Sequence, residues 1–193
     1  MSAANQLPRL MTAAAFLKWE TPDGSDRWEL VDGMPEAIAP ASPRHGLMQT
    51  EAARILGHHL AEYPHCRLVT APGVQPRAGL DNYNVRFPDL AVTSEPVSTA
   101  DRLLHTPLLI VEILSPSDWR RTWANVALYT TISSVREILV LHTAENRAVL
   151  LRREAAGTWP NNPTALALGV SVRLDSISFI ATVAAFYRTA GVA

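Results

Sequence analysis

Two short apolar segments, each with a carboxylate inside it, constrain this sequence more than any other feature. Residues 86–92 read RFPDLAV and residues 108–117 read LLIVEILSPS, so both are rich in apolar and β-branched residues and are bounded by proline or serine. Such runs predict buried strands. Asp89 and Glu112 stand in the middle of them. A lone buried carboxylate is costly unless it is protonated, paired or bound to a cation, so two of them in neighbouring strands indicate a shared partner.

A divalent metal ion is one candidate for that partner. Mg²⁺ takes oxygen ligands and commonly uses one or two carboxylates together with water and substrate phosphates. The alternative is structural: Asp89 would cap a turn after Pro88, and Glu112 would pair with an arginine. Each residue alone is compatible with either interpretation, whereas the two together favour a site.

Length, charge and cysteine content narrow the class of protein. With 193 residues, 48% of them hydrophobic, the chain suits one globular domain at residues 11–193 after an N-terminal tail at 1–10. The formal net charge is −1, so DNA binding would need a local basic patch or a bound metal. Cys66 is the only cysteine, which fits a reducing, cytoplasmic location. We expect neither a signal peptide nor a membrane span, because no run approaches the ~18 apolar residues that a span requires.

The remaining patterns predict an α/β fold, a mixed β-sheet flanked by helices. Asp32-Gly33 suits a type I′ hairpin turn, and Ser42-Pro43 suits the start of a helix. The helix after Pro43 would bury Met48, Ala52, Ile55, Leu56 and Leu60. The predicted helices are 11–19, 43–63, 118–132 and one after Asp175, with Ile180, Val183, Ala184 and Tyr187 on its apolar face. The predicted strands are 27–31, 34–38, 67–75, the two carboxylate segments, 135–142, 148–153 and one or two within 165–174.

Pro88-Asp89, followed by Glu112-Ile-Leu-Ser115, resembles the PD-(D/E)XK nuclease superfamily in the Glu-x-Leu-Ser variant of the Uma-type restriction endonucleases. Further segments in that family's order are WELVDG at 28–33, SPRH at 42–45, LSPS at 114–117, Asn125-x-x-x-Tyr129 and VREILV at 135–140. The resemblance covers about residues 10–153. It implies a restriction-endonuclease-like domain that cleaves DNA with Mg²⁺ or Mn²⁺, and a homodimer is the default assembly for cutting two strands.

The resemblance also implies roles for individual residues. Asp89, Glu112 and the main-chain carbonyl of Ile113 would hold the metal, and Glu29 would be an outer acid near it. The lysine that normally completes such a site would stand four residues before the tyrosine, where this chain has Asn125. An amide can orient water but carries no charge, and removing one preorganised electrostatic contact costs on the order of 10²–10³ in rate.

Other basic side chains are candidates for the missing charge. Lys18 is the only lysine. Arg121 lies one turn before Asn125 on the same predicted helical face, and it could stabilise an anion without acting as a base. Candidate phosphate contacts, for each of which an ordinary surface charge is the favoured interpretation, are Arg44, Arg86, Arg120, Arg121, Arg152 and Arg153.

His45 and Glu29 each have a functional and an ordinary interpretation. His45 falls in the first turn of the helix after Pro43, where the positive helix end disfavours a charged ring, so a neutral imidazole could accept a proton or meet a phosphate-bound water. It could equally be a polar residue at a helix start. Without the resemblance, Glu29 would be a solvent-facing charge on a hairpin.

Three functions remain open from the sequence. The first is a metal-dependent endonuclease acting on DNA, with His45, Arg121 or Asn125 positioning water or phosphate. The second is a catalytically weakened nuclease fold that serves as a nucleic-acid- or protein-binding module, which Asn125 and the near-zero net charge favour. The third is a metal-free sugar hydrolase that divides acid and base roles between two carboxylates. It ranks last because the sequence offers no evident aromatic platform for a sugar.

Overall fold

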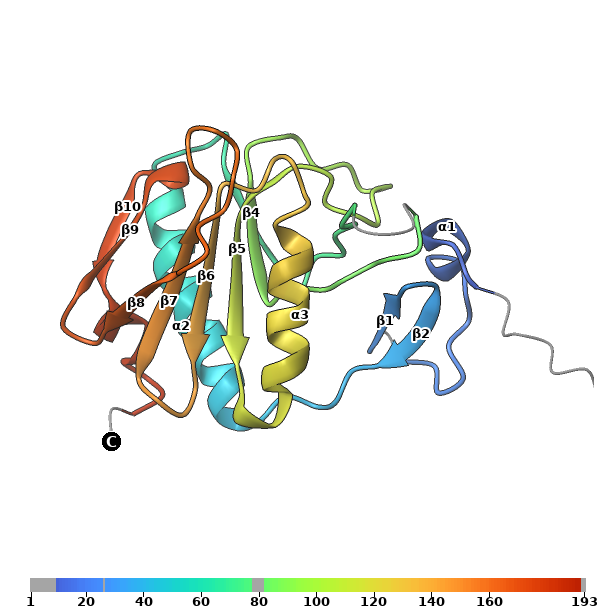
Figure 1. Cartoon of the computed structure of the whole chain (residues 1–193), viewed down its shortest axis with the longest axis horizontal. Helices are drawn as coiled ribbons and strands as arrows, with labels where there is room; N and C mark the ends of the chain where they lie inside the picture. The colour runs from blue at the N-terminus through green and yellow to red at the C-terminus, as the bar shows by residue number, and fades with distance from the viewer. Residues whose placement is uncertain (1–9, 26, 78–81, 192–193) are drawn as a thin grey trace, which may run out of the picture.

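The molecule is built on one mixed six-stranded sheet with a helix packed on each face (Figure 1). The computed structural model describes residues 10–25, 27–77 and 82–191; residues 1–9 of the predicted tail lie outside this part of the chain. The strand order is β3-β4-β5-β6-β7-β8, and only the β5–β6 pair is parallel. These strands are β3 Arg67–Thr70, β4 Leu90–Thr93, β5 Pro107–Leu114, β6 Glu137–His142, β7 Arg147–Arg152 and β8 Thr164–Ala167. The predicted α/β fold with a mixed sheet is confirmed.

Two long helices cover opposite faces of the sheet. Helix α2, Pro43–Leu60, buries Met48, Ala52, Leu56 and Leu60 against one face, as the apolar spacing predicted, whereas Ile55 is only partly buried. Helix α3, Trp119–Tyr129, follows the 3₁₀ turn η1, Pro116–Asp118, and packs on the other face. It connects the parallel strands β5 and β6, which need such a crossover because a tight turn cannot join parallel neighbours.

A separate hairpin stands beside α3, on the right in Figure 1. Strands β1, Trp28–Val31, and β2, Met34–Ala37, are antiparallel, and both turn residues have positive φ, 47° at Asp32 and 84° at Gly33, as a type I′ turn requires. Helix α1, Ala13–Phe16, is shorter than predicted, and its N-cap is Thr12. The hairpin and α1 have their own small apolar cluster, and Leu30 pairs with Val85 through a β-bridge. This bridge ties the hairpin to the segment that leads into β4.

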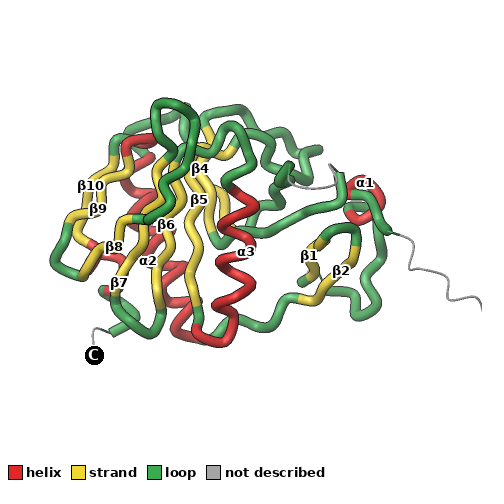
Figure 2. The backbone as a smooth tube through the Cα atoms, in the orientation of Figure 1, coloured by secondary structure: helices red, strands yellow, loops and turns green. Residues whose placement is uncertain are grey.

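The predicted C-terminal helix is wrong. The chain after Asp175 forms a 3₁₀ turn, η2 at Asp175–Ile177, then strand β10 at Phe179–Thr182 and a second 3₁₀ turn, η3 at Val183–Tyr187. Strand β10 pairs with β9, Ser171–Leu174, beside α2 (Figure 2). The buried carboxylate of Glu137 on β6 accepts the backbone N–H groups of Asp175 at 3.0 Å and Ser176 at 2.8 Å. Because a tertiary partner takes these donors and Ser178 turns left-handed at φ 53°, the local helical pattern is overridden.

Candidate active site

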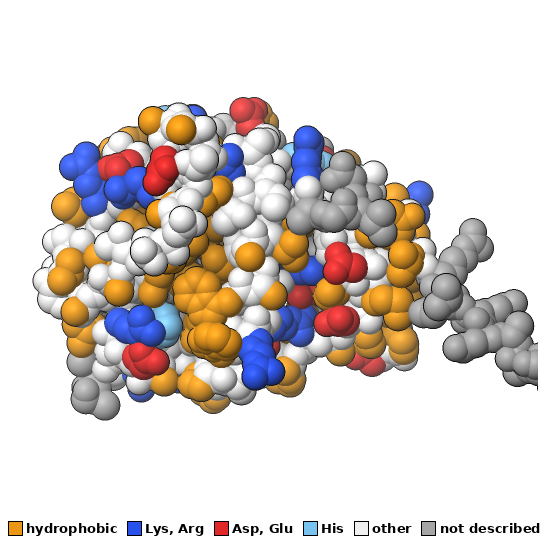
Figure 3. Space-filling view, in the orientation of Figure 1, with side chains coloured by type: hydrophobic (Ala, Val, Ile, Leu, Met, Phe, Trp, Pro, Cys, Tyr) orange, Lys and Arg blue, Asp and Glu red, His pale blue; other side chains and the backbone are white. Residues whose placement is uncertain are grey.

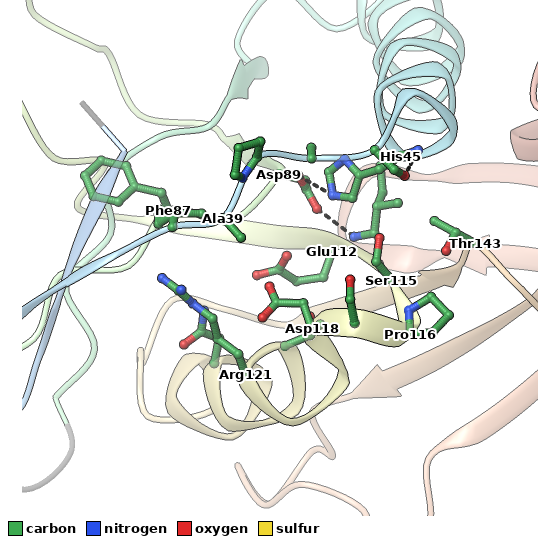
Figure 4. Close-up of a pocket in the computed structure, with 18 of the residues that line it drawn as sticks. Ala39, His45, Phe87, Asp89, Glu112, Ser115, Pro116, Asp118, Arg121 and Thr143 are labelled. Carbon is green, nitrogen blue, oxygen red and sulfur yellow. Dashed lines mark hydrogen bonds and ion pairs between the residues drawn. The ribbon is translucent and has the colours of Figure 1, made fainter. Parts of the chain in front are cut away.

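A cavity of about 500 Å³ opens where the hairpin, the start of α2, the end of β5 and the start of α3 converge (Figure 4). All seven residues singled out from the sequence line it: Glu29, His45, Asp89, Glu112, Ile113, Arg121 and Asn125. In Figure 4, His45 reaches in from α2, Asp118 and Arg121 lie on the α3 side, and Asp89 and Glu112 lie between them. The fold therefore gathers residues from five separate segments at one place, the fifth being the stretch before β4 that carries Asp89.

Sheet register brings the two carboxylates together. Leu90 pairs with Val111 in the antiparallel β4–β5 ladder, so Asp89 lies across from Glu112. Side chains two residues apart in a strand share a face. Glu112 lies between Ile110 and Leu114, and both belong to the cluster under α3. Asp89 differs from the prediction in one respect: it stands in a bend just before β4, because the extended run is interrupted at Phe87-Pro88.

Asp89 is fixed in place by two neighbours. Its Oδ2 accepts the backbone N–H of Ile113 at 2.7 Å, and its Oδ1 lies 3.2 Å from Nε2 of His45. His45 is in the first turn of α2, whose N-cap Ser42 accepts the His45 backbone N–H at 3.2 Å. The imidazole thus orients one carboxylate oxygen while the strand orients the other.

Glu112 is held in a much drier environment. The residue is 7% exposed, and the Tyr129 hydroxyl on α3 donates to its Oε1 at 2.7 Å. Burial, and next the charge of Asp89, raise the pKa of the Glu112 carboxyl well above its ordinary value, although the Tyr129 hydrogen bond opposes this. Ionisation of Glu112 is therefore disfavoured relative to that of an exposed glutamate.

Glu29 is buried, so the interpretation as a solvent-facing hairpin charge is wrong. It is 2% exposed, and its Oε2 accepts from Arg121 Nη2 at 2.7 Å and Nε at 3.1 Å. Arg121 Nη1 also donates to the Ala37 carbonyl at 3.1 Å, and Asn125 Nδ2 donates to Glu29 Oε1 at 3.3 Å. These contacts hold the hairpin against α3 and form one wall of the cavity.

Most of the basic residues considered from the sequence as phosphate contacts do not line the cavity. Arg86 is 2% exposed inside the wall, so its interpretation as a surface phosphate contact is wrong. Lys18 is exposed at the end of α1 and does not line the cavity. Arg153 binds carbonyls at the far end of α3, and Arg152 pairs with Glu137. Among these candidates, Arg121 is the one that reaches the cavity.

Sequence reasoning missed several lining residues. Ser115, Ser117, Asp118, Thr122 and Thr143 face the same space. The first three follow Glu112 closely in a Ser/Pro-rich turn, which was a usable signal. Thr143 comes from the end of β6 and carried none.

The donor set at the cavity floor fits a hard divalent cation. Two carboxylates and the main-chain carbonyl of Ile113 would offer oxygen ligands, and Mg²⁺ keeps several waters when it binds so few protein groups. Within residues 10–25, 27–77 and 82–191, no three or more His, Cys, Asp or Glu side chains gather in a cluster that could hold a metal ion. A site with two carboxylates agrees with that finding, whereas a zinc site with three or four protein side chains does not.

Removing the Tyr129 hydroxyl tests whether this group donates a hydrogen bond to the buried carboxyl of Glu112. We expect Tyr129→Phe to lower the melting temperature by about 2–8 °C, because a buried acceptor loses a hydrogen bond worth about 1–2 kcal/mol in a chain of this size. Tyr63→Phe, in a partly exposed ring, is the matched control. Equal melting temperatures for Tyr129→Phe and the unaltered protein in differential scanning fluorimetry would contradict the arrangement.

Comparisons with known proteins agree with the fold. A family model described as "Putative restriction endonuclease", that of Uma2, matches residues 13–184. The crystal structure of a protein from Anabaena variabilis, described as "a putative nuclease belonging to DUF820", superposes with a TM-score of 0.74. It is 14% identical, and the likeness covers 93% of this chain and 99% of that one, so it shows the fold alone. The search of curated proteins found no match. Because the family model spans most of the sequence, including every residue that the motifs singled out, the chain belongs to the Uma2 family of restriction-endonuclease-like proteins.

Proposed function

We propose that this protein is a metal-dependent endonuclease that hydrolyses DNA phosphodiester bonds. The observation that carries the proposal is that Asp89, which accepts the Ile113 backbone N–H, lies across from Glu112 and lines the same open cavity. A bound Mg²⁺ or Mn²⁺ would lower the pKa of a water nucleophile and offset charge on the phosphorus. No helix in the described part of the chain is long and apolar enough to cross a membrane.

The cavity walls supply positioning. Asp89, Glu112 and the Ile113 carbonyl would hold the metal, with Glu29 as the outer acid. His45 keeps Asp89 oriented through Nε2, and Glu112 must release its proton before both of its oxygens can act as ligands. On the α3 side, Arg121 and Asn125 present N–H donors, which suit phosphate oxygens and ordered water.

A weakened nuclease fold that binds without cutting is the second candidate. Its support is that Arg121 is paired with Glu29, and that the resemblance puts the uncharged Asn125 where the family has a lysine. On the face shown in Figure 3, basic and acidic side chains are interspersed, in keeping with the net charge of −1. A module of this kind would keep the metal site and lack turnover.

Supercoiled-plasmid nicking with a parallel melting measurement separates the two candidates. We expect nicking in Mg²⁺ or Mn²⁺ and none in EDTA, together with a Mn²⁺-dependent rise in melting temperature, because a ligand that binds the folded state alone stabilises it. A melting shift without nicking would favour the binding module. Absence of both would sink the metal-site hypothesis itself.

We further propose a cytoplasmic homodimer. Two-fold symmetry would present one cavity to each strand of a duplex. The single cysteine, Cys66, is free, which suits a reducing compartment. Sedimentation equilibrium at micromolar concentration, with and without duplex DNA, tests the assembly; a monomer under both conditions would contradict it.

A further inference from the structure

Arg86 is a buried cation directly behind the cavity wall. It is 2% exposed, and no other arginine in the described ranges is buried to this degree. Its guanidinium donates from Nε to Asn125 Oδ1 at 2.9 Å, from Nη2 to Asn84 Oδ1 at 3.0 Å and from Nη1 to the Leu30 carbonyl. The guanidinium therefore joins the segment before β4 to both the hairpin and α3.

These contacts fix the orientation of the Asn125 amide. Arginine has only donors, so the amide oxygen must face Arg86 and the amide nitrogen must face away from it. The nitrogen donates to Glu29 Oε1 at 3.3 Å. Glu29 takes one of the two hydrogens on this nitrogen, and Asn125 lines the cavity while remaining 8% exposed. The buried charge of Arg86 thus orients the uncharged amide of Asn125 at the cavity.

The wall has room for one buried cation. Glu29 already pairs with Arg121, and its Oε1 meets the Asn125 amide. Burial lowers the pKa of Arg86, with the Glu29 charge as the largest opposing influence, yet a guanidinium stays protonated. A lysine ammonium at position 125 would face the Arg86 guanidinium, and Glu29 is already paired with Arg121. An unpaired buried charge is strongly destabilising.

We propose that Arg86 is the positioning residue of this site: it holds the wall's single buried positive charge and, through Asn125, aims an N–H donor at the phosphate oxygen or water in the cavity. The part about phosphate rests on the proposed nuclease function. The part about one buried cation rests on the contacts alone and can be tested without activity.

Moving the charge from position 86 to position 125 is the test. The variants are Arg86→Met, Asn125→Lys and the double variant, with Arg86→Lys as the conservative change and Arg67→Met, an exposed arginine on β3, as the control. In EDTA we expect each single variant to lower the melting temperature by about 6 °C or more. The double variant should lose clearly less than the two losses combined, because the ammonium introduced at position 125 no longer stands against the Arg86 guanidinium. Arg86→Lys should fall between the unaltered protein and Arg86→Met.

Nicking by the same set tests the positioning role. We expect Arg86→Met to slow nicking about 10²-fold and the double variant to regain at least tenfold, since the relocated ammonium faces the same cavity. If Arg86→Met does not fold but the double variant does, the lysine at position 125 has restored folding, which supports the claim of one buried cation. If the double variant loses as much melting temperature as the two single variants together, the claim of one buried cation is overturned. If it loses less but nicking does not recover, the positioning role is overturned. An inert unaltered protein would count against the proposed function, while the melting cycle would still decide the place of the cation.

Discussion

Asp89→Asn is expected to reduce plasmid nicking by at least about 10³-fold and to remove the Mn²⁺-dependent rise in melting temperature. The change removes one of the two carboxylates proposed to hold the metal, and it places an amide nitrogen beside Nε2 of His45, where the charged Oδ1 of Asp89 lies. The side chain keeps its size, and its amide oxygen can still accept the Ile113 N–H, so folding should be preserved.

The melting temperature in EDTA shows whether Asp89→Asn still folds normally. Asp89→Asn should melt within a few degrees of the unaltered protein, and Asp101→Asn, an exposed aspartate far along the loop after β4, serves as the control. If Asp89→Asn nicks DNA at more than a tenth of the normal rate, Asp89 is not a metal ligand and the proposed site is wrong.

Glu112→Gln is expected to stabilise the metal-free protein at neutral pH while abolishing nicking. The folded-state pKa of Glu112 lies well above the ordinary value of about 4.5, so folded protein binds this proton more tightly than unfolded protein does. The resulting stability is fully present below about pH 4.5 and is lost as the pH rises through the folded pKa. Glutamine stays neutral throughout and still accepts from Tyr129, so its advantage grows with pH.

The measurement is melting temperature in EDTA from pH 4 to pH 9. We expect Glu112→Gln to gain about 4 °C or more at the alkaline end and to converge with the unaltered protein at the acidic end. Glu62→Gln, on an exposed residue after α2, should show no such trend. A Glu112→Gln protein that is less stable at every pH would contradict the raised pKa of the Glu112 carboxyl. Stability gained where activity is lost is a known signature of functional sites.

Local sequence patterns determined most of the secondary structure and identified the two segments that carry Asp89 and Glu112. The Asp32-Gly33 turn, the capped start of α2 and the apolar runs of β4, β5 and β6 each carry their signal within a few residues. Short-range sterics and burial suffice for such elements. The seven candidate site residues also follow from the sequence, because their order along the chain matches a nuclease family.

Only the tertiary structure decided what each charged side chain does. A buried hairpin glutamate and an exposed one have the same local sequence, so Glu29 could not be placed until the hairpin docked against Arg121. Arg86 was wrongly predicted at the surface for the same reason: arginines are usually exposed, and nothing near it in sequence indicates Asn125 as its partner. After Asp175, a helical pattern gave way to strand β10 because Glu137 accepts the backbone donors of η2 from a different strand. Electrostatics and hydrogen bonding act between segments far apart in the chain, and the folded arrangement alone specifies those distances.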